Sequence, residues 1–280
     1  MKLWAKGVML DLTYPHVMGI LNMTPDSFFD GGKHQILDKV LTYVNKMIHS
    51  GATIIDVGGE STRPYALGVS VEEELERVIP IIESISQRFS VWISINTSKP
   101  EVISQAAQAG AYMINDIRSL RLPGALAMAQ KVGLPVCLVH MRGQPHNMQD
   151  NPYYHNVLHD VEAFFLEHIA RCEDIGIKKV QLVLDPGFGF GKSIIHNYQL
   201  LGNLKRLNHF DVPLLVGISR KSMVHKLLGI RPLHSLSGSL ACAVIAALQG
   251  AHIFRVHDVK ETIEALKIVE AMQAIHGKDI

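Results

Sequence analysis

Residues 91–115 read VWISINTSKPEVISQAAQAGAYMIN, and this stretch contains the pattern that decides the fold. It begins with a short apolar run, and the spacing of Ser98 and Glu101 then predicts a capped helix before a second apolar run starts at Ala111. Both apolar runs are nearly continuous instead of alternating with polar residues, as in strands that are buried on both faces of a parallel sheet. The stretch therefore predicts one strand–helix–strand unit.

The same alternation of a short apolar run and a longer stretch with helical spacing extends along the whole chain. The predicted strands are Val17–Leu21, Thr53–Val57, Val91–Ile95, Ala111–Asn115, Pro135–Val139, Val180–Leu184, Pro213–Ile218 and Ala251–Val256. Eight such units in 280 residues favour an α/β fold of the (β/α)8 TIM barrel type over an open doubly wound sheet. The open sheet would need GxGxxG after its first strand, where this chain has NMTPDSFFDGG at 22–32.

The spacing of Ser70 and Glu73 predicts another capped helix, and 221–250 is long enough for a broken or double helix. No linker or compositional shift divides the chain, so we predict a single barrel domain over 17–280. Residues 1–16 would form a short N-terminal extension that covers the bottom of the barrel.

The composition argues against several classes of protein. Lys and Arg number 27 against 26 Asp and Glu, a net charge of +1, whereas nucleic-acid-binding proteins usually have a basic excess. Three widely spaced cysteines without a CxxC pair suit a reducing cytosol better than a disulfide framework or a zinc motif. The longest apolar run, 240–248, is far shorter than the about 20 residues of a membrane helix. We therefore expect a cytoplasmic protein that binds neither membrane nor nucleic acid.

Polar side chains follow the predicted strands, at the end where a barrel gathers its active-site residues. They are Asn22, Asp56, Asn96, Asn115 with Asp116, His140, Asp185, Ser219 with Lys221, and Arg255 with His257. Helix caps and turns explain polar residues at any one junction, but they do not require an Arg, a Lys and two His in addition. We therefore interpret the set as a functional site.

Three loops at the same end add detail. The loops at 22–32 and 58–66 are candidate lids, with long surface turns as the alternative. The third, DPGFGFGKS at 185–193, fails as a nucleotide P-loop because only three residues separate its glycines at 187 and 191. We expect these glycines to let the backbone approach a flat ligand, with Phe188 or Phe190 offering a ring face.

The charges indicate the kind of ligand. Lys221, Arg255 and His257 form a local cationic cluster, which suits a compact anion. Asp185 and the amides of Asn96 and Asn115 suit the donors and acceptors along the edge of a heterocycle. The residues thus predict a flat heterocycle that carries phosphate, and they leave open phosphate or pyrophosphate displacement, isomerisation and decarboxylation.

The motifs resemble those of the dihydropteroate synthases, a family of pterin-binding TIM barrels, over nearly the whole chain. The resembling stretches are GILNMTPDSFFDGG, GATIIDVGGESTRP, ISINTSKP, INDI, VLDPGFGFGKS, LVGISRKS and FRVHDV. The resemblance implies a transferase of folate biosynthesis, commonly a homodimer. Its members join p-aminobenzoate to (7,8-dihydropterin-6-yl)methyl diphosphate, which releases pyrophosphate and gives 7,8-dihydropteroate.

The resemblance also implies roles for individual residues. Asn22 would bind the Mg²⁺ that sits on the pyrophosphate, and Asp30 would stabilise a pterin-methyl cation formed when the C–O bond breaks before the amine attacks. Lys221, Arg255 and His257 would complete the catalytic set. The pterin diphosphate would be bound by Thr62, Arg63, Asn96, Asn115, Asp185, Lys221, Arg255 and His257. The p-aminobenzoate pocket, where sulfonamides compete, would comprise Phe28, Pro64, Phe190, Lys221 and Ser222.

One residue departs from the family pattern. Where the family typically has Asp in a VDTSKP-like motif, this chain has Asn96, which keeps the size and one acceptor but loses the charge. The loss of a hydrogen bond to a charged group would lower binding affinity or reaction rate roughly ten- to a hundredfold. Natural drift, an engineered substitution and a non-catalytic pterin-binding paralogue are the three explanations. The related pterin-binding domain of corrinoid-dependent methyltransferases is disfavoured by the intact first two loops.

Overall fold

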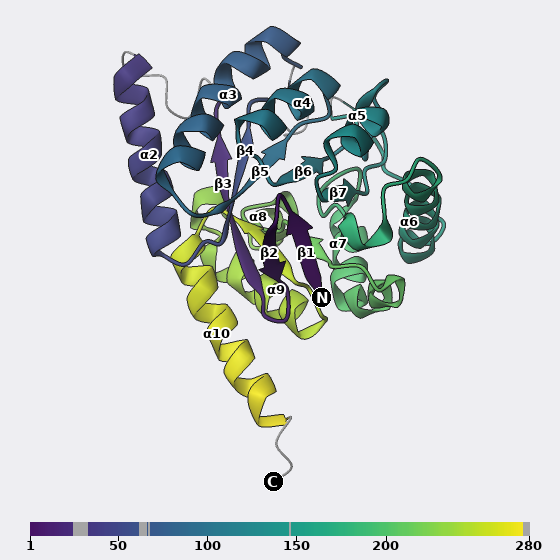
Figure 1. Cartoon of the computed structure of the whole chain (residues 1–280). Coiled ribbons are helices and arrows are strands. Elements are labelled where there is room, and N and C mark those ends of the chain that lie inside the picture. Colours follow the sequence, from purple (N-terminus) through teal and green to yellow (C-terminus); the bar gives the residue numbers. More distant parts are fainter. Residues whose placement is uncertain (25–32, 62–65, 67, 146, 277–280) are drawn as a thin grey trace.

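The computed structural model describes residues 1–24, 33–61, 66, 68–145 and 147–276, and in these the predicted barrel is present (Figure 1). Its eight parallel strands are β3 (His16–Asn22), β4 (Ile54–Gly58), β5 (Trp92–Asn96), β6 (Met113–Asp116), β7 (Val136–Val139), β8 (Leu182–Asp185), β9 (Leu215–Val216) and β10 (Ile253–Val256). They are ordered β8-β7-β6-β5-β4-β3-β10-β9. A parallel bridge between Leu184 and Leu214 joins the two ends of this order and nearly closes the barrel.

Helices surround the strands, as Figure 1 shows. They are α2 (Lys33–His49), α3 (Val71–Arg88), α4 (Pro100–Ala109), α5 (Ala125–Val132), α6 (Val157–Asp174), α7 (Ile194–Gly202), α8 (Ser222–Leu227), α9 (Leu236–Leu248) and α10 (Val259–His276), with 3-10 turns η1 (Lys179–Gln181), η2 (Leu204–Phe210) and η3 (Pro232–His234). The expected broken helix at 221–250 is thus α8, η3 and α9. No helix within the described ranges has the length and apolar character needed to cross a bilayer.

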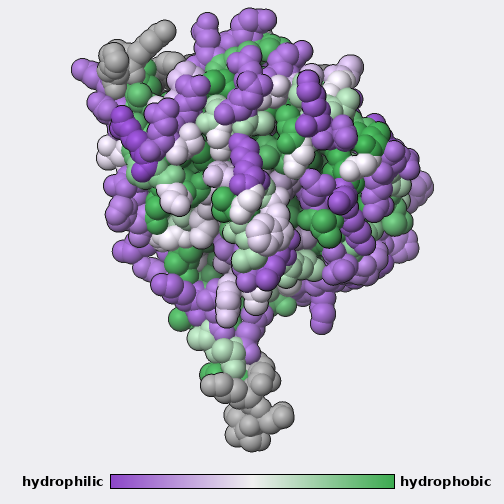
Figure 2. Space-filling model, viewed as in Figure 1, coloured by the Kyte–Doolittle hydropathy of each residue, from purple (hydrophilic) through white to green (hydrophobic). Residues whose placement is uncertain are grey.

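The strands are buried on both faces, as their continuous apolar runs predict. Every residue of β4, β5, β6, β7 and β8 is buried, and the apolar ones belong to one hydrophobic core. The viewed surface is mostly hydrophilic, with hydrophobic residues scattered over it (Figure 2). This division between core and surface leaves the strand ends as the place where polar side chains are buried together.

The N-terminal residues form an antiparallel hairpin of β1 (Lys2–Ala5) and β2 (Val8–Asp11). Leu3 and Leu10 of this hairpin are buried in the main core. Strand β1 contacts η1, which directly precedes β8, so the hairpin lies at the N-terminal end of the barrel strands. It is therefore opposite the end at which the polar residues gather.

Two local predictions are wrong. Ser98 does not cap α4: the N-cap is Lys99, and the Ser98 hydroxyl instead donates to buried Asp116 of the next strand. The strand predicted from Val180 begins only at Leu182, because 179–181 form a 3-10 turn in which Val180 is 71% exposed. In both places a long-range partner or a turn overrides a local pattern. The Ser70 cap of α3 is confirmed, since its side chain accepts from the Glu73 amide at 3.1 Å.

Candidate active site

A buried carboxylate on β4 lies at the centre of the polar strand ends. Asp56 has no exposed surface, and its Oδ2 accepts from Nε of Arg255 at 2.7 Å and from Nδ2 of Asn96 at 3.3 Å. Nδ2 of Asn115 lies 3.3 Å from both oxygens of the same carboxylate. Three residues that the sequence assigns to ligand binding are thus tied to one carboxylate, which the sequence places in the functional set without a role of its own.

Alternate strands supply this interior set. Asp56, Asn115, Asp185 and Arg255 come from β4, β6, β8 and β10, which alternate around the barrel. Side chains from alternate strands of a barrel fill its interior in shared layers, so the sequence separation of these residues does not keep them apart. Within the described part of the chain, Oδ1 of Asn115 is buried without a hydrogen-bond partner. An orphaned acceptor of this kind is costly, and it points to a donor supplied by a ligand.

A second group combines opposite charges next to an aromatic ring. Nζ of Lys221 lies 4.1 Å from the centre of the Phe190 ring and donates to the carbonyl oxygen of Phe188. Burial lowers the pKa of Lys221 to about 8, although nearby Asp185 opposes this shift. Burial raises the pKa of the Asp185 carboxyl, which accepts from the amide of Gly187 at 2.8 Å. Lys221 therefore keeps its charge at neutral pH and loses its proton near pH 8, well below the range of an exposed lysine.

The glycine-rich loop after β8 is held by a buried lysine. Nζ of Lys192 lies 2.9, 3.2 and 3.3 Å from the carbonyl oxygens of Gly187, Phe190 and His140, and 2.8 Å from Nδ1 of His140, so its N–H groups are shared among these four atoms. Burial lowers the pKa of both Lys192 and His140 well below their ordinary values. The lowered pKa of His140 favours its neutral imidazole, and with Nδ1 accepting from Lys192 the ring proton would be on Nε2. Lys192 thereby fixes the loop that presents Phe190 to Lys221.

The expectation that these glycines admit a flat ligand is wrong for two of them. A side chain at Gly187 would overlap the carbonyl of His140, and one at Gly191 would overlap the carbonyl of Arg142. Both glycines have positive φ, +69° and +63°, so they also adopt a conformation that other residues rarely take. They admit the chain that follows β7 rather than a ligand. Phe188 is fully buried in the core, which leaves the half-buried Phe190 as the accessible ring.

The remaining described candidates lie around the same rim. Nδ1 of His257 lies 3.1 Å from Oγ of Ser219, which joins the ends of β9 and β10. Ser222 is the first residue of α8, directly after Lys221. A side chain at Gly58 would lie 3.8 Å from Oδ1 of Asn22 and 3.5 Å from Cβ of Asn96, so these two asparagines lie on either side of that glycine. Within the described residues, no cluster of three His, Cys, Asp or Glu could hold a metal ion.

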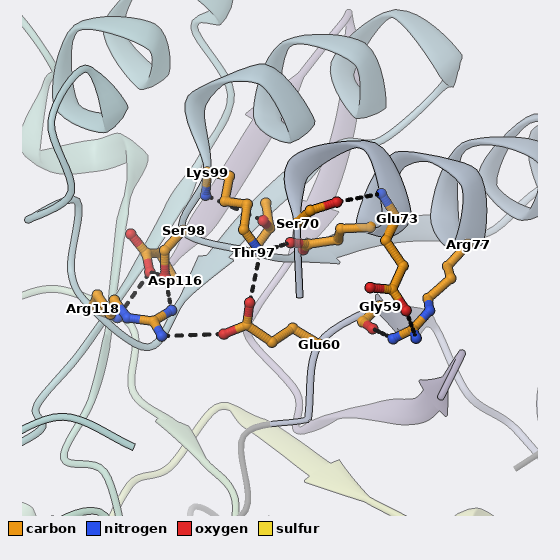
Figure 3. Close-up of polar contacts among 11 residues, drawn as sticks. Gly59, Glu60, Ser70, Glu73, Arg77, Thr97, Ser98, Lys99, Asp116 and Arg118 are labelled. Atoms are coloured by element: carbon orange, nitrogen blue, oxygen red, sulfur yellow. Dashed lines mark hydrogen bonds and ion pairs between the residues drawn. The ribbon is translucent and has the colours of Figure 1, made fainter. Parts of the chain in front are cut away.

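A network of ion pairs supports the loops beside this rim (Figure 3). Glu60, after β4, accepts from Lys99 at 2.6 Å and from Arg118 at 3.1 Å. Lys99 also pairs with buried Glu74 of α3, and although burial by itself lowers its pKa, the two carboxylates raise the pKa of Lys99 above its ordinary value. A small pocket lined by Glu60 and Arg118 also touches Asn96. The network therefore joins the loops after β4, β5 and β6 at the edge of the site.

The structure brings together most of the predicted site residues that it describes. Asn22, Asn96, Asn115, Asp185, Phe190, Lys221, Ser222, Arg255 and His257 all lie at the C-terminal ends of the strands or directly after them. Phe28, Asp30, Thr62, Arg63 and Pro64 lie outside the described residues. The hub role of Asp56 and the anchor role of Lys192 went unassigned from the sequence. The sequence signal for Asp56 was a charged residue inside an otherwise apolar strand. The signal for Lys192 was a charged residue beside a run of glycines.

The chain matches the family described as pterin binding enzyme over residues 18–257. It is 64% identical to the dihydropteroate synthase of Escherichia coli strain K12, over 97% of this chain and 96% of that protein. The dihydropteroate synthase of Haemophilus influenzae is 52% identical, over 97% of this chain and 98% of that protein.

Solved structures agree with these relatives. The Yersinia pestis dihydropteroate synthase in complex with a sulfonamide drug has a TM-score of 0.94 and 60% identity, over 98% of this chain and all of that one. The Xanthomonas albilineans dihydropteroate synthase with 4-aminobenzoic acid has a TM-score of 0.91 and 45% identity, over 98% of this chain and 99% of that one. The chain therefore belongs to the pterin binding enzyme family and, within it, to the dihydropteroate synthases.

Proposed function

We propose that this chain condenses (7,8-dihydropterin-6-yl)methyl diphosphate with p-aminobenzoate to give 7,8-dihydropteroate and pyrophosphate, a step of folate biosynthesis. The observation that carries the proposal is the buried acceptor of Asn115, which has no partner in the described chain and lies in a set that includes Asp185 and Arg255. A dihydropterin ring presents several N–H donors along one edge, and these match such acceptors. Family membership supplies the second support.

The reaction breaks the C–O bond between the pterin methylene and the diphosphate, and the diphosphate leaves with the electron pair. The amine nitrogen of p-aminobenzoate then bonds to the methylene and loses one proton. Arg255 and His257 would bind the departing oxyanions, and preorganised cations of this kind stabilise charge that develops in the transition state. Because Nε of Arg255 is held by Asp56, its two terminal nitrogens stay available for the anion. The roles of Asp30, Thr62 and Arg63 remain part of this proposal.

The donor set fits Mg²⁺. This ion prefers oxygen ligands and usually takes only one or two from the protein, with substrate phosphates and water completing its shell. Asn22 offers one such oxygen at the end of β3, beside Gly58 and near the cationic residues that would bind diphosphate. The ion would neutralise charge on the leaving group. Asn22 is the residue that we assign to it.

The second substrate would bind beside the glycine-rich loop. Phe190 offers a ring face, and the adjacent ammonium of Lys221 suits a carboxylate or the polarised edge of the pterin. Ser222 at the start of α8 would complete this end of the pocket, together with Phe28 and Pro64. Sulfonamides, which resemble p-aminobenzoate in size and shape, would compete at the same place.

Asn96 does not by itself favour a non-catalytic paralogue. Its amide nitrogen donates to Asp56, so the residue has a place in the interior network. A neutral amide therefore replaces the family's carboxylate without leaving a buried polar group beside Asp56 unpaired. We therefore keep the catalytic function as the proposal and non-catalytic pterin binding as the outcome that would replace it.

We also propose a homodimer that uses α9 and α10. These helices pack against each other and expose apolar side chains at helical spacing, Ile245 and Leu248 on α9 and Ile268, Met272 and Ile275 on α10. Hydrophobic and hydrophilic residues both lie on the protruding end of α10 (Figure 2). Exposed apolar side chains that gather on two neighbouring helices are candidates for protein–protein contacts. For the location we propose the cytoplasm, since all three cysteines are buried as free thiols.

The test is pyrophosphate release by the purified protein supplied with the pterin diphosphate and Mg²⁺. Release that depends on p-aminobenzoate and is blocked by a sulfonamide is the expected result. Tight binding of the pterin diphosphate without release would favour the non-catalytic paralogue, and the variant Asn96→Asp would then show whether the amide is the cause.

A further inference from the structure

We propose that Asp56 is a positioning residue that sets the hydrogen-bonding polarity of the pterin pocket. It would act through Asn96, Asn115 and Arg255, and not by touching the ligand. This inference rests on the proposed pterin-binding function and deepens it. Asp56 has no exposed surface, and its carboxylate accepts from Asn96, Asn115 and Arg255.

The two oxygens of Asp56 carry different sets of hydrogen bonds and share one donor. Oδ2 accepts from Nε of Arg255 at 2.7 Å and from Nδ2 of Asn96 at 3.3 Å. Nδ2 of Asn115 lies 3.3 Å from both Oδ1 and Oδ2, and among the described residues Oδ1 has no other donor. An ionised carboxylate has acceptors and no donors, so each amide must turn its NH2 group toward it. Asp56 therefore decides which way both amides point.

The consequence for the ligand is a defined pattern of acceptors. With its NH2 group committed to Asp56, Asn115 presents Oδ1, the atom that is buried without a partner in the described chain. Asn96 likewise has only its oxygen left to offer. Together with the Asp185 carboxylate, these oxygens demand N–H donors from the bound heterocycle. A ring that offers lone pairs at the Asn115 position would leave two buried acceptors facing each other.

Because Oδ2 accepts from Arg255 and Asn96 whereas Oδ1 faces Asn115, donor and acceptor can be exchanged between positions 56 and 115. In Asp56→Asn, the new amide nitrogen must take the Oδ1 place, because the Oδ2 place still has to accept from Arg255 and Asn96. The NH2 group of Asn115 would then face another NH2 group at the Oδ1 place and would keep only its shared contact with the oxygen at the Oδ2 place, which favours turning it toward the ligand. In the double variant Asp56→Asn with Asn115→Asp, the amide of residue 56 donates to the new carboxylate. That carboxylate keeps one oxygen as an acceptor for the ligand.

The experiment measures the Kd of the pterin diphosphate by calorimetry with Mg²⁺ present and p-aminobenzoate absent. Asp56→Asn and Asn115→Asp should each weaken binding roughly ten- to a hundredfold, the effect of one mismatched buried hydrogen bond. The double variant should bind within roughly fivefold of the wild type, a strong departure from additivity. The matched control, Asp56→Asn with Asn96→Asp, has the same charge but leaves the mismatch at Asn115, so it should stay as weak as Asp56→Asn.

Unfolding by urea in the same variants separates positioning from support of the fold. If both double variants bind alike, or if Asp56→Asn binds as the wild type does, Asp56 does not set the polarity of the pocket. If the loss of affinity follows only the fraction of folded protein, the residue is structural and the inference is overturned. Failure of the wild type itself to bind the pterin diphosphate would instead refute the proposed function.

Discussion

Replacement of Gly187 by alanine tests how closely the loop after β8 is held against the chain that follows β7. A Cβ atom at this position would overlap the carbonyl oxygen of His140 and lie 2.9 Å from its carbonyl carbon. Carbon atoms pack at about 3.5–4.0 Å, so the two backbones would have to separate by roughly an ångström. Lys192 donates to the carbonyl oxygens of both residues, at 2.9 and 3.3 Å, and such a separation would break at least one of these bonds.

The magnitude follows from three separate costs. A non-glycine residue in the left-handed region costs about 1–2 kcal/mol. Overpacking adds about 1–3 kcal/mol, and a buried hydrogen bond left without its partner adds about 1–3 kcal/mol. Gly133 is a matched control, because its φ of +67° is close to the +69° of Gly187 and a Cβ atom there would have no neighbouring atom within 4 Å. Gly133→Ala therefore carries the first cost alone.

The assay is urea unfolding of both variants and the wild type under the same conditions. Gly187→Ala should lose at least about 2 kcal/mol more than Gly133→Ala, which is the smallest sum of the overpacking and hydrogen-bond costs. The remaining folded protein should also bind p-aminobenzoate more weakly, because Phe190 moves with the loop. If the two variants lie within about 1 kcal/mol of each other, the close approach to His140 does not constrain the loop and the reasoning is refuted.

Three further predictions concern charge and assembly. Because the pKa of Lys221 is about 8, its charge is lost as pH rises, and affinity for the pterin diphosphate should fall about tenfold between pH 7 and pH 9; Lys221→Met should abolish this dependence. The pKa of Lys221 is about 8 in the folded protein and 10.5 in the unfolded chain. The wild type should therefore gain free energy of unfolding over Lys221→Met as the pH rises from 8 to 10.5, because only the unfolded chain binds the proton there. Below pH 8 the difference between the two proteins should stay constant. Lys192→Met leaves three carbonyl oxygens and an imidazole nitrogen without their donor and should cost about 3–5 kcal/mol in urea unfolding; a loss under about 1 kcal/mol would contradict the anchor role. Light scattering should show that Ile268→Glu gives a monomer whereas Leu166→Glu, at an exposed apolar position on α6, leaves the dimer intact; equal behaviour would place the interface elsewhere.

The order of the elements and the end of the barrel that carries the site could be predicted from the sequence. Apolar runs of strand length report burial on both faces, and parallel strands place every polar residue that follows them at one end. That reasoning alone placed Asn96, Asn115, Asp185, Lys221 and Arg255 at this end of the barrel, where the structure has them. The chemistry of the ligand was narrowed in the same way, because residue types carry charge and hydrogen-bonding capacity with them.

The partners of those residues were decided only by the tertiary structure. Asp56 and Arg255 are 199 positions apart and meet because the barrel closes. Ser98 leaves its local cap to donate to Asp116, and Gly187 makes room for the backbone of His140 instead of a ligand. A local pattern reports the preference of a few neighbouring residues, whereas hydrogen bonding in a buried site is satisfied by whatever the closed barrel brings within about 3 Å. The sequence by itself therefore determined which end of the barrel carries the site, and the closure of the barrel decided which polar groups inside it are paired and which are left for a ligand.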